Sequence, residues 1–262
     1  MSNAEVKASS PIRTSLYERE GSMRGNLKRP SLRRPDTIFP YTFKALRKEF
    51  GIPEPSSLSW VVQTRSDNSV VCHEMLTTFG FTKDQMHRAA ERYHLGRSKS
   101  GQTIYWMIDD MGRCFDGRLG DSWVSTMLKA RYPTAAPYLR VQHCLFGLHQ
   151  LGEVSGKRPI GLVESERSAV ILSELYPKLL WMAYSYGPNF TVDKFEPLQG
   201  HKVTLYPLTD PYMDNYLYCI DLADRARNLY DLDISVSHFL EDNASPDQKK
   251  RYIDLLDFIL DK

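Results

Sequence analysis

Three acidic residues in the C-terminal half of the chain follow the ends of short apolar segments. Glu164 comes directly after residues 159–163, and Asp210 and Asp214 follow residues 203–206. In an open parallel sheet, ligands bind at the edge where the carboxyl ends of the strands lie. Carboxylates from two such ends can converge on a hard cation. The spacing therefore makes Glu164, Asp210 and Asp214 candidates for a magnesium site.

The same acidic residues have a simpler interpretation. Carboxylates at strand ends often cap the helix that follows, and the dipole of a helix N-terminus stabilises nearby negative charge. Glu164 and Glu166 lie at the start of a predicted helix, where Glu166 is expected on the surface. Both interpretations remain open at this point.

A second group of candidates is basic and lies mainly before the acidic segments. It consists of Arg113, Arg118, Lys129, Arg131 and Arg140, with Trp123, Tyr132 and Tyr138 among them. Basic residues interleaved with aromatics hold single strands by neutralising phosphates and stacking bases. The alternative is a packed aromatic core beneath an ordinary solvated face. Arg167 joins this group, although it can also pair with Glu164 one helical turn away.

Periodicity indicates which elements carry these residues. Helical spacing predicts helices at 42–50, 69–79, 82–93, 123–131, 165–176, 211–229 and 246–260. Thr82 and Gln85 have the spacing of a capping box. Alternating or apolar runs predict strands at 103–109, 113–118, 141–146, 159–163, 179–183, 203–206 and 234–236. Strands separated by helices predict an α/β fold with a small, mainly parallel sheet flanked by helices. An α+β part with helices and a β-hairpin precedes that sheet.

Composition limits the class of protein. Thirty-four Lys and Arg against thirty-two Asp and Glu exclude a polybasic binder of the histone kind. No apolar run reaches the roughly 18 residues of a membrane span, so we expect a soluble, cytoplasmic protein without membrane contacts. The four cysteines are scattered, so we expect no zinc. The predicted domains are a disordered basic arm (1–40), an N-terminal subdomain (41–156) and an α/β domain with a C-terminal helix (157–262).

The order of several segments resembles a known family. An apolar strand ending in Glu, a helix, and a later strand followed by an acidic motif are similar to the Toprim domain of primases, topoisomerases and nucleases. The segments Tyr93-His94-Leu95-Gly96, Gln142-His143-Cys144-Leu145-Phe146-Gly147 and Val163-Glu164-Ser165-Glu166-Arg167-Ser168-Ala169 resemble, in that order, a primase-like Toprim family of bacterial mobile elements. That family is known mainly as a domain of unknown function. The resemblance covers about residues 79–236.

The resemblance implies roles for particular residues. Glu164 takes the position of the catalytic acid/base or metal-organising Glu, and the Asp-x-Asp motif that holds Mg²⁺ falls on Leu208-Thr209-Asp210. Only Asp210 matches, and Asp214 is the residue that can supplement it. Because Leu208 replaces one carboxylate ligand, a two-metal arrangement lacks support. The resemblance also implies a basic residue at Arg118.

These observations predict a primase-related, nucleic-acid-binding protein of a mobile element with a degenerate magnesium site. The ligand is single-stranded or duplex nucleic acid. One alternative is an active magnesium-dependent primase or nuclease that uses Glu164, Asp210 and Asp214. Another is a protein-interaction module that keeps the fold without catalysis.

Overall fold

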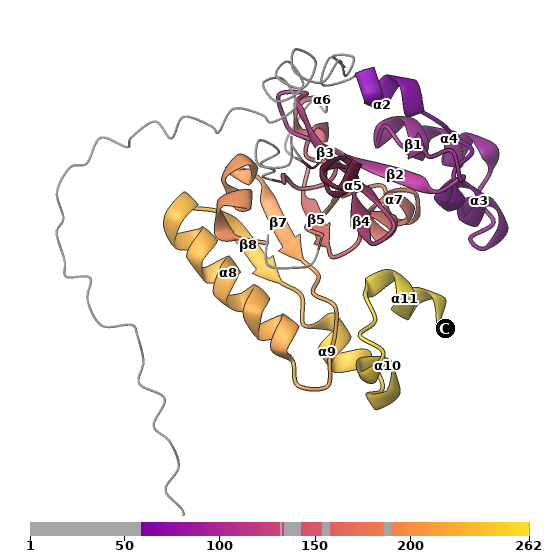
Figure 1. Ribbon diagram of the computed structural model, residues 1–262. Coiled ribbons are helices and arrows are strands. Elements are labelled where there is room, and N and C mark those ends of the chain that lie inside the picture. The colour runs from indigo at the N-terminus through magenta and orange to yellow at the C-terminus, as the bar shows by residue number, and fades with distance from the viewer. Residues whose placement is uncertain (1–58, 132, 134–142, 154–157, 186–189, 262) are drawn as a thin grey trace, which may run out of the picture. The chain divides into compact units, whose positions relative to one another are not determined.

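The computed structural model describes residues 59–131, 133, 143–153, 158–185 and 190–261 (Figure 1). All of them belong to one compact unit, Asp36–Lys262. The arm predicted for residues 1–40 and the helix predicted for residues 42–50 lie outside the described residues. No helix of the described part of the chain is long and apolar enough to cross a bilayer.

The first half of the described chain is built on an antiparallel sheet. Its strands lie in the order β1 (Gly96–Arg97), β2 (Thr103–Ile108), β3 (Cys114–Leu119) and β4 (Ser122–Trp123). β2 and β3 form the predicted hairpin. The Asp109 carboxylate closes its turn by accepting hydrogen bonds from the backbone N–H groups of Met111 (3.0 Å) and Arg113 (2.8 Å). This Asx-type turn explains why a strongly apolar strand stops at Asp109.

Four helices accompany this sheet: α2 (Ser59–Thr64), α3 (Val70–Thr77), α4 (Lys83–Arg92) and α5 (Val124–Arg131). The predicted capping box at the start of α4 is confirmed, because the side chains of Thr82 and Gln85 each accept the other's backbone N–H. On one face of the sheet, Trp106 and Ile104 form a small core with residues of α2 and α5. The opposite face, which carries Met107 and Tyr105, joins the main core of the molecule.

The second half contains a fully parallel sheet, which confirms the predicted α/β class. Its strands lie in the order β6 (Leu180–Ala183), β5 (Ile160–Val163), β7 (Lys202–Leu205) and β8 (Asp233–Val236). Every residue of β5 and β6 is buried, as expected for strands covered on both faces. Helix α7 (Glu166–Leu175) packs on one face, and α8 (Asp214–Tyr230) and the 3₁₀ helix η2 (Val192–Leu198) pack on the other.

Two predicted elements differ from the structure. The C-terminal helix expected at 246–260 is divided into α10 (Pro246–Lys250) and α11 (Leu255–Leu260), and α9 (Phe239–Asn243) precedes them. Tyr252 adopts a left-handed φ of 54° and Asp254 caps the new helix, so the chain turns between them. Residues 141–146 do not form the expected strand where they are described. Phe146 makes only an isolated antiparallel bridge to Ala183, before the short helix α6 (Gln150–Glu153).

Candidate functional site

The carboxyl ends of the parallel strands place the predicted acidic residues at one edge of the sheet. Glu164 is half-buried immediately after β5. Its backbone oxygen accepts a hydrogen bond of 3.0 Å from the N–H of Ser185, which follows β6. The turn that carries Glu164 is therefore tied to the neighbouring strand end.

Asp210 is buried, and its carboxylate is fully used within the protein. One oxygen accepts the backbone N–H groups of Tyr212 (2.9 Å) and Asp214 (3.1 Å), and the other accepts the backbone N–H (2.9 Å) and side-chain amide (2.8 Å) of Asn215. Burial raises the pKa of Asp210, but these hydrogen bonds outweigh it and hold the pKa below its usual value. Asp210 thus satisfies the first N–H groups of α8.

The predicted magnesium ligands do not fit the ion as they are arranged. All four hydrogen bonds to Asp210 come from N–H donors, Leu208 offers no oxygen ligand, and Asp214 is exposed on the first turn of α8. In the described parts of the chain, no three His, Cys, Asp or Glu side chains form a group that could hold a metal ion. Mg²⁺ requires oxygen ligands, so the described arrangement does not offer the ion the carboxylates that the sequence predicted for it.

Glu166 lies in a different environment from the surface position expected for it. It is 7% exposed, and the Ser185 hydroxyl donates a hydrogen bond to its carboxylate. Burial raises the pKa of Glu166, while the Ser185 hydrogen bond and the charges of Arg118 and His143 partly offset that effect. Ser185 has a left-handed φ of 49°, a conformation that costs free energy for a non-glycine residue. The N-terminus of α7 therefore brings a buried carboxylate towards the antiparallel sheet.

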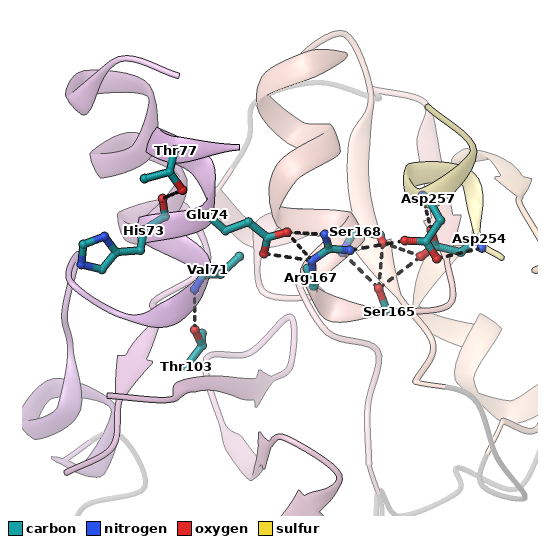
Figure 2. A network of polar contacts seen from close by, with 10 residues as sticks. All are labelled: Val71, His73, Glu74, Thr77, Thr103, Ser165, Arg167, Ser168, Asp254 and Asp257. Carbon is teal, nitrogen blue, oxygen red and sulfur yellow. Dashed lines mark hydrogen bonds and ion pairs between the residues drawn. The ribbon is translucent and has the colours of Figure 1, made fainter. Parts of the chain in front are cut away.

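Arg167 pairs with Glu74 of α3 and not with Glu164. Its Nε lies 2.9 Å from each carboxylate oxygen of Glu74, and its Nη1 lies 3.6 Å from Asp257 of α11. Figure 2 shows Arg167 between these two carboxylates. The pKa of Arg167 is raised mainly by the hydrogen bonds to Glu74. This arginine links three helices, so its predicted contact with nucleic acid would compete with two ion pairs.

The C-terminal segment contacts the loops that follow strands β5 and β7. The Asp254 carboxylate accepts hydrogen bonds from the hydroxyls of Ser168 and Ser165 at the start of α7 (Figure 2). The backbone N–H of Thr209, after β7, donates to the carbonyl of Ile253 at 3.0 Å. The segment before α11 therefore connects the loops that follow β5 and β7.

The other predicted basic residues differ in what they contact. Arg113 is bound to the buried Asp109 through its Nε at 2.7 Å. Lys129 is half-buried on α5 and has no ion pair with any residue that the structure describes. Arg140 and the side chain of Arg131 lie outside the described part of the chain. Among the described side chains of α5, Lys129 is thus a positive charge that can contact a ligand.

Arg118 is held by an aromatic stack. In the β3–β4 pairing Arg118 lies opposite Trp123, and its guanidinium carbon is 5.0 Å from the centre of the Trp123 ring. The His143 ring stacks on Trp123 with 3.7 Å between centroids and 14° between planes. Among the described residues, Arg118 makes no ion pair within 4 Å. We call Arg118, Trp123 and His143 the Arg118 stack.

The buried carboxylate of Asp116 anchors this stack. One oxygen accepts the backbone N–H groups of Gly117 (2.8 Å) and Ser125 (3.0 Å). The other accepts the Ser125 hydroxyl and lies 2.9 Å from Nε2 of His143. Asp116 has no exposed surface. It joins β3, the start of α5 and the segment at His143, and so it fixes the ring beneath Trp123.

Asp116 and His143 were not predicted as site residues, and Glu166 was expected on the surface. The Asp116-Gly117-Arg118 motif offered one signal, because a glycine inside a predicted strand often marks a close approach of another group. In the structure, a Cβ at Gly117 would lie 2.8 Å from the Trp106 ring. A glycine is therefore required between the acidic and the basic residue, where the sheet packs closely against Trp106. The contact of Asp116 with His143 joins residues 27 positions apart, which no local pattern predicts.

Comparison with solved structures finds three similar primase cores. They are a DnaG primase catalytic domain bound to ssDNA, a DnaG catalytic core and the E. coli primase catalytic core. Each is 14% identical; they cover 85%, 85% and 86% of this chain, and 79%, 78% and 83% of their own, with TM-scores of 0.43, 0.43 and 0.42. No curated protein matches the sequence.

A family match covers slightly more than half of the 262 residues. Residues 71–209 match the family described as a domain of unknown function, DUF6371. The matched region runs from α3 to Thr209 after β7, and so it contains the Arg118 stack, Glu164 and Glu166. The chain belongs to the DUF6371 family.

Proposed function

We propose that this protein binds nucleic acid through Arg118 and Lys129, and that it does not use a magnesium site at Asp210. One observation carries the proposal. Arg113 and Arg167 are paired with carboxylates, whereas Arg118 and Lys129 form no ion pair with the residues that the structure describes. An unpaired cation at a surface can replace the counterions of a phosphate backbone.

The resemblance to primase-like Toprim proteins of mobile elements supports the same ligand class. It does not support retained catalysis, because Leu208 removes one expected carboxylate and N–H donors occupy the oxygens of Asp210. We infer a nucleic-acid-binding protein related to primases, acting within a mobile element, in which the carboxyl edge of the sheet has a structural role.

The test is fluorescence anisotropy with labelled single-stranded DNA, single-stranded RNA and duplex DNA at several salt concentrations. We expect affinity to fall as salt rises, and the double variant Arg118→Ala/Lys129→Ala to reduce the salt slope by about 1 to 2. Arg225→Ala is a matched control, since Arg225 is an exposed arginine on α8 paired with Asp221 at 3.6 Å. Wild-type binding that is absent or independent of salt would contradict the proposal.

Calorimetric titration with Mg²⁺ tests the second part. We expect no saturable binding by the wild type, and the same result for Glu164→Gln. Saturable binding that disappears in Glu164→Gln would favour the active magnesium-dependent alternative instead.

A further inference from the structure

We infer that the Arg118 stack is a contact for an unpaired nucleobase, so that the protein recognises single strands through a base as well as through phosphates. This inference rests on the proposed nucleic-acid binding and specifies one contact within it. Two observations carry it: the planar support beneath Arg118 and the buried anchor below that support.

The rings of Trp123 and His143 support the guanidinium of Arg118, which is the planar group that a base can contact. Stacking with His143 covers one face of Trp123, and Arg118 lies over the same indole. His143 is buried, with 9% of its side chain exposed, while Arg118 and Trp123 are half-buried. Guanidinium planes stack on bases as aromatic rings do. The group that a base can reach in this stack is therefore Arg118.

The anchor fixes the position of the stack. Asp116 is wholly buried and accepts hydrogen bonds from Ser125 and Gly117, with His143 at 2.9 Å. A platform held in place before binding loses less conformational entropy when its ligand arrives. A mobile surface arginine that met only phosphates would not require this support.

Lys129 complements this contact. It is half-buried on α5 and forms no ion pair with a residue that the structure describes, so its charge can meet a phosphate. Arg118 supplies the planar contact, and its charge adds to the attraction for the strand.

The experiment compares a single-stranded DNA oligonucleotide with an abasic strand of the same length, and with the duplex of the same sequence. We expect the wild type to bind the intact strand roughly tenfold more tightly than the abasic strand. Arg118→Lys keeps the charge but loses the plane, and should reduce this ratio to near one. Lys129→Gln should weaken binding to both strands equally, and Arg225→Lys should leave the ratio unchanged.

A second readout uses the indole itself. The intact strand should quench tryptophan fluorescence more than the abasic strand does, and Trp123→Phe should remove that difference while the thermal unfolding midpoint shows that the variant is folded. Equal binding of intact and abasic strands by the wild type, or an unchanged ratio in Arg118→Lys, would overturn the inference while the proposed function stands. Failure of every nucleic acid to bind would overturn both.

Discussion

The buried carboxylates beside the two sheets are hydrogen-bonded in the same way, but the arginines beside the two sheets differ in whether they form ion pairs. Asp210 beside the parallel sheet and Asp116 in the antiparallel sheet each accept hydrogen bonds on both oxygens. Arg167, next to the parallel sheet, is held by two acidic partners, whereas Arg118 lies on Trp123 without an ion pair among the described residues.

The difference shows that position at a strand end does not identify a functional residue by itself. At the carboxyl edge of the parallel sheet, the polar side chains complete helix caps and connect helices, so most of their bonding capacity is used inside the protein. In the antiparallel sheet, the buried polar groups support a residue that still has an available face. Function follows from the bonding capacity that a side chain retains.

The largest expected effect is at Asp116. Asp116→Ala leaves the buried N–H groups of Gly117 and Ser125 without an acceptor and removes the partner of His143. We expect a loss of about 3–5 kcal/mol in the free energy of unfolding, measured by urea titration. Asp121→Ala, at an exposed site in the β3–β4 turn, is the control and should change stability by less than about 0.5 kcal/mol. A loss below about 1 kcal/mol at Asp116 would contradict its role as an anchor.

The second-largest loss in the free energy of unfolding is expected at Asp210. Asp210→Ala removes the acceptor for the first N–H groups of α8, and we expect a loss of about 1–2 kcal/mol at neutral pH. Addition of Mg²⁺ should not change the thermal unfolding midpoint of the wild type or of the variant. A rise of the midpoint with Mg²⁺ in the wild type alone would show that Asp210 binds the ion.

The pH dependence of Asp210 sharpens this prediction. Its pKa in the folded state lies below the unfolded value near 3.9. The stabilisation is therefore fully present above about pH 4 and is lost as pH falls through the folded-state pKa. The stability difference between wild type and Asp210→Ala should shrink in that acid range. A difference that stays constant down to pH 2 would indicate that the charge of Asp210 is not what stabilises α8.

The longer strands and helices could be predicted from the sequence because their causes are local, whereas the two-residue strands β1 and β4 and the division between α10 and α11 were not predicted. Alternation in β2, the apolar runs of β5 and β6, and the capping box of α4 each lie within a few residues. The site could be predicted only in part. Asp210 and Glu164 were found at strand ends, but whether a carboxylate is free depends on donors such as Asn215, and that is set by the turn before α8. The pair Arg167–Glu74 joins residues 93 positions apart, and only the packing of α3 against α7 creates it.

A smaller effect is expected for the ion pair between Arg167 and Glu74. Both side chains are partly exposed, at 34% and 21%, so solvent weakens their attraction. A double-mutant cycle with Arg167→Ala and Glu74→Ala should give a coupling of about 1 kcal/mol in the free energy of unfolding. Both single variants should bind single-stranded DNA with wild-type affinity. Affinity reduced in Arg167→Ala but not in Glu74→Ala would return Arg167 to the nucleic-acid interface.

The smallest effect is expected at Glu166, where the two regions meet. Burial raises the pKa of Glu166 above the unfolded value near 4.3, so the folded state loses stability as pH rises from that value to the folded-state pKa. Glu166→Gln keeps an acceptor for the Ser185 hydroxyl but cannot ionise. We expect the variant to match the wild type at pH 4 and to exceed it slightly, by about 1 kcal/mol or less, above that window. Urea titrations of both proteins at pH 4 and at neutral pH measure this difference. A variant that is less stable than the wild type at neutral pH would show that the ionised carboxylate stabilises the fold through Arg118 and His143. The positive charge of the Arg118 stack would then be largely neutralised within the protein and less available to nucleic acid.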